Sequence, residues 1–170
     1  MDALAPLVFL GLGSNLGDRS AALEEALVRL EGHGFRTTRR SSIWQTEPVG
    51  GPPQGWFLNA AVGGETALSP EGLLRACLET ERAMGRARGE KDGPRRIDVD
   101  ILLFGEKRCE GPGLVIPHPR LHERRFVLEP LFEIAPRMRH PVLGLTVAEL
   151  RESCPDASAV RPWVRAEATA

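Results

Sequence analysis

The chain has 170 residues and a mass of 18.6 kDa, which suits one sizeable core and is too short for two well-packed domains. Hydrophobic residues make up 42% and charged residues 26%, ordinary values that exclude disorder as the main state. The formal net charge of −1 argues against a nucleic-acid coat protein or a basic membrane-surface module. A local basic site for a phosphorylated small molecule is still compatible with that charge.

Cysteine usage and hydropathy predict the compartment. The 3 cysteines are widely spaced and form no C-x-x-C pair, so neither a disulfide framework nor a zinc ribbon is expected. No apolar run approaches the roughly 20 residues that a membrane span needs, and the first residues lack the pattern of a signal peptide. We therefore expect a cytoplasmic protein with no membrane or nucleic-acid partner.

The first third of the chain predicts a strand, a helix and a second strand. Leu7–Leu12 is a short apolar run that ends in a glycine-rich turn, which is typical of a buried strand. Asp18 can cap the helix that follows, and the sequence from Phe35 to Trp44 alternates like an exposed or edge strand. The inward face of the helix is predicted to carry apolar residues at helical spacing, namely Leu23, Ala26, Leu27 and Leu30.

A loop, a strand and a second helix are expected next. Three prolines and three glycines make Glu47–Gly55 an irregular loop, after which Phe57–Val62 resumes as a strand. Ser69 and Pro70 are typical of a helix start, and this helix should continue to about Met84. Its predicted inward residues are Leu73, Leu74, Cys77 and Leu78.

In the remainder, Ile97–Phe104 is the clearest strand of the chain. A helix is predicted over Arg124–Ile134 despite Pro130, and a short last helix over Thr146–Arg151. The sequence has no internal repeat and no low-complexity linker. We therefore predict one domain over residues 1–170, of the α+β class with a mostly antiparallel sheet.

Two carboxylates lie within that clearest strand. Because strand side chains alternate, Asp98 and Asp100 point to one side while Ile97, Val99 and Ile101 pack on the core. A divalent cation such as Mg²⁺ would relieve the repulsion between two neighbouring carboxylates. The alternative is a solvated polar face of a half-buried strand, and a bare D-x-D does not decide between the two interpretations.

Arginines and glycines just before this strand favour phosphate chemistry. The segment contains glycines and four arginines, Arg86, Arg88, Arg95 and Arg96. It would place cations beside the two carboxylates, and a nucleoside triphosphate bound with Mg²⁺ requires both kinds of group. The alternative is a solvated charge run in a surface loop. Neither a dinucleotide fingerprint nor a Walker A sequence is present, so any ATP site must be built another way.

Four ordered motifs together resemble the 6-hydroxymethyl-7,8-dihydropterin pyrophosphokinase family. The matching stretches cover about residues 8 to 150 in the family's order and are the following: Gly13-Ser14-Asn15-Leu16-Gly17; Phe57-Leu58-Asn59-Ala60-Ala61-Val62; Gly93-Pro94-Arg95-Arg96-Ile97-Asp98-Val99-Asp100-Ile101-Leu102-Leu103-Phe104-Gly105; and Ile116-Pro117-His118-Pro119-Arg120 through Phe126, Pro130 and Glu133-Ile134-Ala135-Pro136. The resemblance implies a ferredoxin-like fold. It also implies transfer of the β,γ-diphosphate of ATP to the hydroxymethyl oxygen of the dihydropterin, leaving AMP, as a step of folate synthesis.

The same resemblance implies roles for individual residues. Asp98 and Asp100 match the family's magnesium ligands, and Arg86 and Arg95 match catalytic arginines that contact ATP phosphates. The positions implied for ATP binding are Arg86, Arg88, Arg95, Ile101, His118 and Arg124. Those implied for the pterin are the amide of Asn59, the aromatic walls Phe57 and Phe126, and backbone groups around Thr46, Pro48 and Val49. A pterin edge needs both a donor and an acceptor, and an asparagine amide supplies both.

Three positions depart from the family's pattern. Asp92 stands where some relatives carry a tryptophan, in a loop that is one residue shorter. Gly113 and Val115 stand where some relatives direct polar side chains towards ATP. These departures put the affinity for ATP and the energetics of loop closure in question, but not the magnesium ligands.

Other functions fit part of the pattern. Glycosyltransferases and nucleotidyltransferases also use D-x-D with Mg²⁺, and they would release different products. A ferredoxin-like RNA-binding module would show exposed aromatic residues with basic neighbours on its strands, and it would not need paired carboxylates. We expect a monomer, with a homodimer as the alternative.

Overall fold

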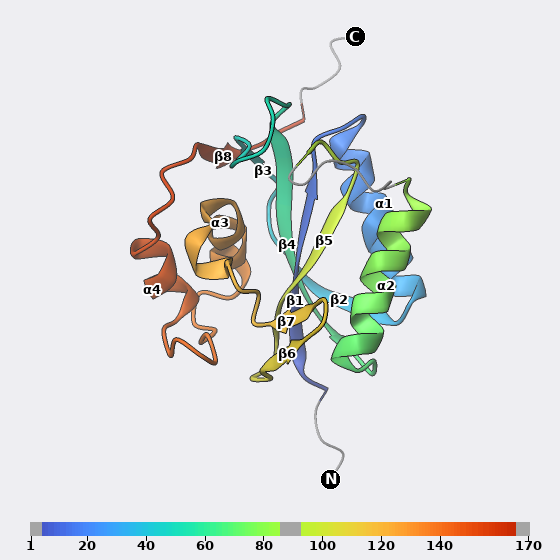
Figure 1. Ribbon diagram of the computed structural model, residues 1–170, viewed down its shortest axis with the longest axis vertical. Helices are drawn as coiled ribbons and strands as arrows, with labels where there is room; N and C mark the ends of the chain where they lie inside the picture. The colour runs from blue at the N-terminus through green and yellow to red at the C-terminus, as the bar shows by residue number, and fades with distance from the viewer. Residues whose placement is uncertain (1–4, 86–92, 166–170) are drawn as a thin grey trace.

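The computed structural model describes residues 5–85 and 93–165, and in it an antiparallel sheet has helices on both faces (Figure 1). The strands and helices follow one another along the chain in this order: β1 Leu7–Ser14, α1 Arg19–Gly32, β2 Phe35–Arg40, β3 Trp44–Thr46, β4 Phe57–Thr66, α2 Pro70–Ala83, β5 Asp98–Phe104, β6 Cys109–Gly111, β7 Leu114–Ile116, a 3₁₀ turn Leu121–Glu123, α3 Arg125–Ile134, α4 Val147–Glu152 and β8 Val160–Pro162. The predicted α+β class and the antiparallel sheet are confirmed.

The order of strands in the main sheet is β5-β1-β4-β3-β8, and β2 pairs with β4 further along the strand. The pairs β1–β4, β1–β5, β2–β4, β3–β4 and β3–β8 are all antiparallel. Strand β1 therefore lies between β4 and β5. This placement brings the start of β4 and the start of β5 to the same end of the molecule, next to the end of β1.

The predicted helix starts are confirmed by their capping hydrogen bonds. The Asp18 carboxylate accepts from the backbone N–H of Ala21 at 3.1 Å, and Ser69 Oγ accepts from the N–H of Gly72 at 3.1 Å with Pro70 at the first helical position. Because each cap satisfies an N–H that the helix itself leaves unpaired, both helices begin at defined residues.

Two apolar cores lie on opposite faces of the sheet. Helices α1 and α2 cover one face, and α3 with α4 beyond it covers part of the other (Figure 1). Alternation along β1 sends Leu10 and Leu12 to the α1/α2 core and Phe9 to the α3 core. The alternation along β5 likewise sends Val99 and Ile101 to the α1/α2 core.

Two predictions about the elements were wrong in part. The single strand expected from Phe35 to Trp44 is two strands, β2 and β3, which pair with the same edge of β4 on either side of a break at residues 41–43. Strand β3 is not an edge, because β8 pairs with its other side. Leu78, expected to face inward, is 47% exposed, because α2 packs on the sheet along a narrower stripe than its apolar pattern suggested.

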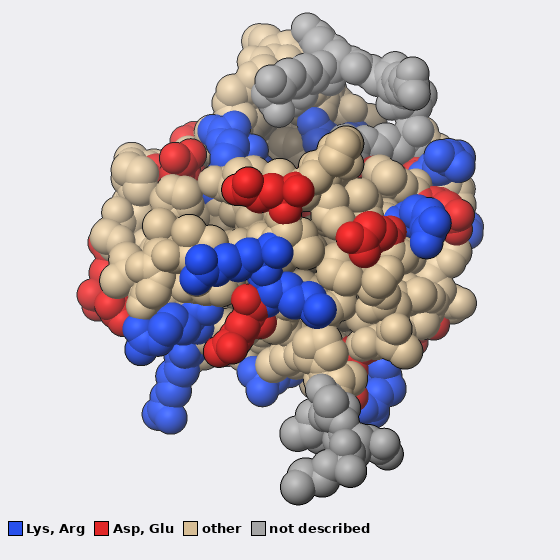
Figure 2. Space-filling view, turned by 60° about the horizontal axis from the view of Figure 1, so that its bottom comes forward, with Lys and Arg blue, Asp and Glu red and all other residues tan. Residues whose placement is uncertain are grey.

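The surface carries charges of both signs. On the face shown in Figure 2, basic and acidic side chains are intermixed and form no broad patch of one sign. None of the described helices is long and apolar enough to cross a membrane.

Candidate active site

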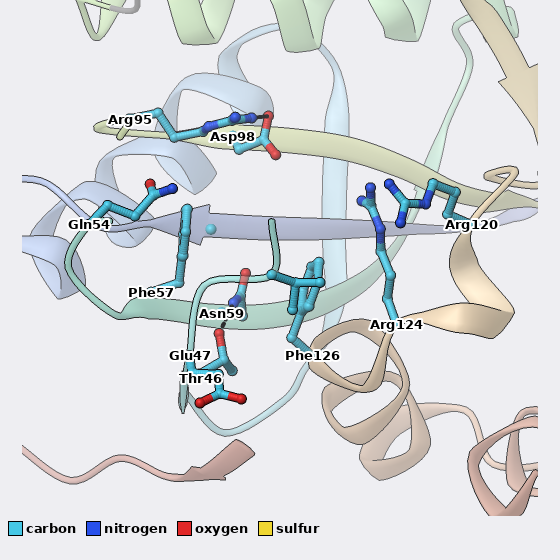
Figure 3. Close-up of a pocket in the computed structure, with 12 residues that line it drawn as sticks. Thr46, Glu47, Gln54, Phe57, Asn59, Arg95, Asp98, Arg120, Arg124 and Phe126 are labelled. Carbon is cyan, nitrogen blue, oxygen red and sulfur yellow. Dashed lines mark hydrogen bonds and ion pairs between the residues drawn. The ribbon is translucent and has the colours of Figure 1, made fainter. Parts of the chain in front are cut away.

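A pocket opens at the end of the sheet where β1 ends and β4 and β5 begin (Figure 3). Its lining comes from four strands, the loop between β3 and β4, the segment before β5, and the start of α3 with the segment that leads into it, as follows: Gly13, Thr46, Glu47, Val49, Gln54, Phe57, Asn59, Arg95, Asp98, Arg120, Arg124 and Phe126. A smaller cavity shares Gly13, Asn59, Asp98 and Phe126 with it and extends to Asp100.

The floor of the pocket is set by strand register. Gly13 on β1 pairs with Asp98 on one side and Asn59 on the other, and Gly11 pairs with Asp100. A Cβ atom at position 13 would lie 2.6 Å from Asn59 Oδ1, so only glycine fits beside this amide. The two glycines therefore leave open the space between the carboxylates of β5 and the amide of β4.

Asp98 and Asp100 have the chemistry of a magnesium site. Both carboxylates are partly exposed, lie on the same face of β5 and border the connected cavities, as the alternation predicted. Among residues 5–85 and 93–165 no group of three or more His, Cys, Asp or Glu side chains could enclose a metal ion. Two hard oxygen ligands with open space beside them suit Mg²⁺, which commonly binds one or two carboxylates and takes its other ligands from water and phosphate.

Aromatic side chains form the walls on either side of Asn59. Phe57 and Phe126 flank this amide and face the same space (Figure 3). The Asn59 side chain is 8% exposed, and its Nδ2 donates to Thr46 Oγ1 at 2.7 Å. Because that hydrogen bond fixes the amide in the sheet, its remaining donor and acceptor capacity is held ready for a planar ligand between the rings.

Arginine side chains line two further sides of the pocket. Arg95 Nη1 lies 3.3 Å from Asp98 Oδ1, and Arg120 and Arg124 extend side by side from the segment before α3 (Figure 3). The Arg124 guanidinium also lies over the Phe126 ring, 5.5 Å from its centroid. Such an arrangement suits an anion with several oxygens, because guanidinium groups bind phosphate oxygens in pairs.

His118 is near these arginines and is kept neutral. Burial is the main cause that lowers its pKa to about 4, and the positive charges of Arg124 and Arg120 lower it further. Nδ1 of His118 accepts from the backbone N–H of Arg120 at 3.1 Å. In the neutral ring the proton is therefore on Nε2, which is a hydrogen-bond donor.

The structure brings most of the predicted site residues together. Thr46, Val49, Phe57, Asn59, Arg95, Asp98, Arg124 and Phe126 line the pocket, whereas half-buried Pro48 does not. The side chain of Ile101 lies in the α1/α2 core, on the opposite face from Asp98, so only its backbone can contact a ligand. Arg86, Arg88 and Asp92 lie outside the described residues.

The two other departures from the family's pattern do not line the pocket. Gly113 has φ +74°, a backbone conformation that favours glycine, and Val115 is exposed on β7. The choice of glycine at position 113 therefore has a local cause in the turn between β6 and β7.

Four lining residues were not predicted as site residues, namely Gly13, Glu47, Gln54 and Arg120. Glu47 and Gln54 belong to a loop defined only by its turn residues, and neither stood out in spacing. Arg120 follows the Pro117-His118-Pro119 segment, which was itself singled out. Its position next to this segment was the feature of the sequence that could have indicated Arg120 as a site residue.

Sequence comparisons find relatives over most of the chain. A family model described as 7,8-dihydro-6-hydroxymethylpterin-pyrophosphokinase (HPPK) matches residues 9–136. A 2-amino-4-hydroxy-6-hydroxymethyldihydropteridine pyrophosphokinase from Methylorubrum extorquens is 48% identical over 142 residues, covering 83% of this chain and 89% of that protein. The enzyme of the same name from Bacillus subtilis is 42% identical over 158 residues, covering 92% and 90%.

Solved structures share the fold. An HPPK-DHPS from Plasmodium falciparum, whose crystal structure holds pterin and p-hydrobenzoate, matches with a TM-score of 0.67 and 16% identity over 87% of this chain. This chain spans 44% of that longer protein. At so low an identity the likeness concerns the fold alone, and it confirms the predicted ferredoxin-like arrangement.

Proposed function

The chain belongs to the 7,8-dihydro-6-hydroxymethylpterin-pyrophosphokinase family, and we propose that it transfers diphosphate from ATP to the hydroxymethyl group of 6-hydroxymethyl-7,8-dihydropterin in folate biosynthesis. The products are AMP and the pterin diphosphate. One observation carries the proposal: a single pocket brings together two aromatic walls, a buried amide, a carboxylate and three arginines.

The pterin occupies the space between Phe57 and Phe126. Its flat ring stacks on the two aromatic faces, and Asn59 pairs with its polar edge. Backbone groups near Thr46, Pro48 and Val49 complete the recognition of this edge. This support is geometric, since Thr46 orients the Asn59 amide and Val49 lines the same cavity.

ATP occupies the side of the arginines. Arg95 and Arg124 bind its phosphates together with Arg86 and Arg88, and the neutral His118 donates from Nε2. Arg120 adds a cation that the sequence pattern did not identify. Ile101 takes part through its backbone, which belongs to the edge strand of the sheet.

Asp98 and Asp100 hold Mg²⁺. The ion supplies Lewis-acid stabilisation of the charge that develops on the transferred phosphates, and it lowers the pKa of the attacking alcohol. The protein holds the two carboxylates on one face of β5, where strand pairing with β1 fixes their direction. Arg95, 3.3 Å from Asp98, keeps a cation next to the carboxylates.

In the transfer step, the hydroxymethyl oxygen attacks the β-phosphorus of ATP. The new O–Pβ bond forms as the bond from Pβ to the oxygen bridging Pα breaks, AMP leaves with that oxygen, and the hydroxyl proton is released. The residues of the pocket position the two substrates for an in-line displacement and neutralise charge, so no side chain has to act as a strong base.

We further propose one domain over residues 1–170 that acts as a cytoplasmic monomer. All the described residues that line the pocket belong to one chain, which supports a monomer over the alternative of a homodimer. Light scattering after size-exclusion chromatography tests this choice, because a homodimer would double the measured mass.

Mass spectrometry of the reaction products tests the proposed function. The protein is mixed with ATP, Mg²⁺ and 6-hydroxymethyl-7,8-dihydropterin, and we expect AMP together with a pterin that has gained two phosphate groups. ADP with a singly phosphorylated pterin, or released pyrophosphate, would contradict the proposal. An Asp98→Ala preparation serves as the control for contaminating kinases.

A further inference from the structure

The edge of the sheet that β2 and β3 form is covered at β3 and open at β2. Strand β8 pairs with the outer side of β3 and runs antiparallel to it. Strand β2 pairs with β4 on its inner side, and no other strand within residues 5–85 and 93–165 pairs with it. Because an edge strand turns backbone N–H and C=O groups away from the sheet, β2 offers hydrogen-bonding groups to an added strand.

A groove follows this open edge and has α1 as its other wall. Arg40 pairs with Glu24 of α1, whereas Arg39 Nη1 donates to the Ile134 carbonyl at the end of α3, 3.0 Å away. Residues directed to both faces of the sheet therefore border the groove, as expected if it runs along the strand edge. Its volume is about 310 Å³, and its lining consists of Glu24, Leu27, Val28, Glu31, Thr37, Thr38, Arg39 and Arg40.

The α1 wall offers apolar surface to this groove. Val28 is 70% exposed, and the neighbouring Leu27 is almost buried. A groove between a helix and the open edge of a strand is one in which an extended peptide can bind as an added strand. Backbone hydrogen bonds then hold the peptide, and contacts with its alternate side chains select its sequence.

The charges along the groove distinguish its two ends. A turn of two residues joins α1 to β2, so the two elements run in opposite directions and Glu31 lies near the start of β2. Arg39 and Arg40 lie at the end of β2, where Arg40 is already paired with Glu24. A strand added antiparallel to β2, as β8 is to β3, would start beside Arg39 and end beside Glu31.

We propose that the groove between α1 and β2 binds an extended segment of a partner protein, added antiparallel to β2. The segment carries an acidic residue at its start, apolar residues in its middle and a basic residue at its end. These groups pair with Arg39, contact Val28 and pair with Glu31, respectively. The groove shares no described lining residue with the proposed active site, so this interaction does not depend on the proposed function.

A second copy of this chain is a poorer occupant of the same edge. Antiparallel pairing of two β2 strands about Thr38 would set Arg36 opposite Arg40 of the partner subunit. Like charges directly opposite each other destabilise a strand pair. Charge complementarity therefore favours a partner segment with an acidic start over self-pairing.

Two labelled hexapeptides of the same composition test the proposal. The forward peptide is Glu-Val-Thr-Val-Thr-Lys and the reverse peptide is Lys-Thr-Val-Thr-Val-Glu, both blocked at their ends. We expect fluorescence anisotropy to show about tenfold tighter binding of the forward peptide, because only this order satisfies both charges in an antiparallel strand. Backbone amides of β2 should exchange more slowly when it is bound. Equal affinities, binding of neither peptide, or unchanged exchange in β2 would overturn the proposal.

Variants of the groove show whether the peptide uses the expected contacts. Arg39→Glu should weaken binding of the forward peptide about tenfold and restore it for a peptide that begins with lysine, a rescue that a loss of folding cannot produce. Val28→Asp should also weaken binding without a change in melting temperature, because the side chain is exposed. Arg75→Glu is the matched control, since it makes the same change of charge at an exposed position of α2 outside the groove.

The outcomes of these variants decide the proposal. It predicts that Arg75→Glu binds the forward peptide like the wild type. An equal loss in Arg75→Glu, or wild-type affinity in both groove variants, would contradict the site. A doubled mass in light scattering that Arg39→Glu or Val28→Asp abolishes would assign the edge to a second copy of the chain and would overturn the proposal.

Discussion

At the end of the sheet that carries the pocket, the two faces are made from the same strands and differ in polarity and in how completely side chains fill them. Towards α1 and α2, the side chains of Leu10, Leu12, Val99 and Ile101 are apolar and buried. Towards α3, the same stretches present glycine on β1 and aspartate on β5. One face is filled by side chains, while on the other the end of the sheet is left open and polar.

Because of this difference, residues that stabilise the fold and residues that line the active site follow one another directly along β1 and β5. Because strand side chains alternate, each site residue on β1 and β5 is next to a residue of the core. Neighbouring substitutions in β1 or β5 should therefore have different consequences, one for folding and the other for catalysis.

The largest expected effect comes from Asp98→Ala or Asp100→Ala. Loss of a magnesium ligand should lower the rate by about a thousandfold, roughly 4 kcal/mol of transition-state stabilisation. The melting temperature should stay near that of the wild type because the core face of β5 is untouched. Initial rates of AMP formation and thermal unfolding monitor the two properties.

Val99→Ala is the matched variant on the other face of β5. It removes buried methyl groups and should lower the free energy of unfolding by about 2 kcal/mol, while kcat stays close to the wild-type value. Near-normal activity of either aspartate variant at limiting Mg²⁺ would contradict the assignment of the metal ligands.

Gly13→Ala should be the next most damaging change. The added Cβ would meet Asn59 Oδ1 at 2.6 Å, so the amide has to move away from its place beside the pterin. We expect a loss of about 2 kcal/mol in pterin binding, measured by calorimetry. Unchanged affinity would show that the Asn59 amide does not need this position.

Asn59→Ala should weaken pterin binding by about 1–2 kcal/mol, because the polar edge of a buried ligand is left without its partner. Binding of α,β-methylene-ATP alone should barely change. An equal loss for both ligands would mean that Asn59 supports the fold of this end of the sheet rather than pterin recognition.

Arg120→Ala should give the reverse pattern at a smaller size. Its side chain is about half exposed and already pairs with Glu123 at 3.6 Å, so we expect a loss of about 1 kcal/mol in nucleotide affinity. Pterin affinity in the absence of nucleotide should not change. The affinity for nucleotide is measured for the variant and the wild type at low and at high salt. Equal affinities of the two proteins at both salt concentrations would exclude the contact.

The last prediction concerns the pH dependence of stability, and its effect is small near neutral pH. The pKa of His118 is lowered from 6.5 to about 4, so below pH 6.5 the unfolded chain binds a proton that the folded protein does not. Protonation of His118 in the unfolded chain therefore lowers the free energy of unfolding as the pH falls from 6.5 to about 4. His118→Gln should make this decline shallower, measured by urea unfolding at several pH values. His140, whose pKa is also lowered, maintains part of the decline in both proteins.

The parts of the fold that depend on local rules could be predicted from the sequence. Asp18 and Ser69 mark helix starts because capping involves only the following three residues, and the alternation in β5 placed Asp98 and Asp100 correctly on one face. The resemblance to a family supplied most of the residues that line the pocket. These predictions needed no knowledge of distant contacts.

The remaining features depend on distant contacts that leave no local pattern. Strand β8 has three residues and exists because it pairs with β3, more than 100 residues earlier. The contacts of Asn15 with Gln54 and Arg95 join residues that are 39 and 80 positions apart. Leu78 is likewise exposed because the stripe of α2 that is buried against the rest of the fold is narrower than its apolar pattern suggested.

A crystal structure of the protein with α,β-methylene-ATP, Mg²⁺ and 6-hydroxymethyl-7,8-dihydropterin tests the central claim most directly. The account predicts the pterin ring between Phe57 and Phe126, the metal on Asp98 and Asp100, and the hydroxymethyl oxygen in line with the β-phosphorus. A pterin or nucleotide bound elsewhere, such as in the groove between α1 and β2 that Glu24 and Arg40 line, would contradict it.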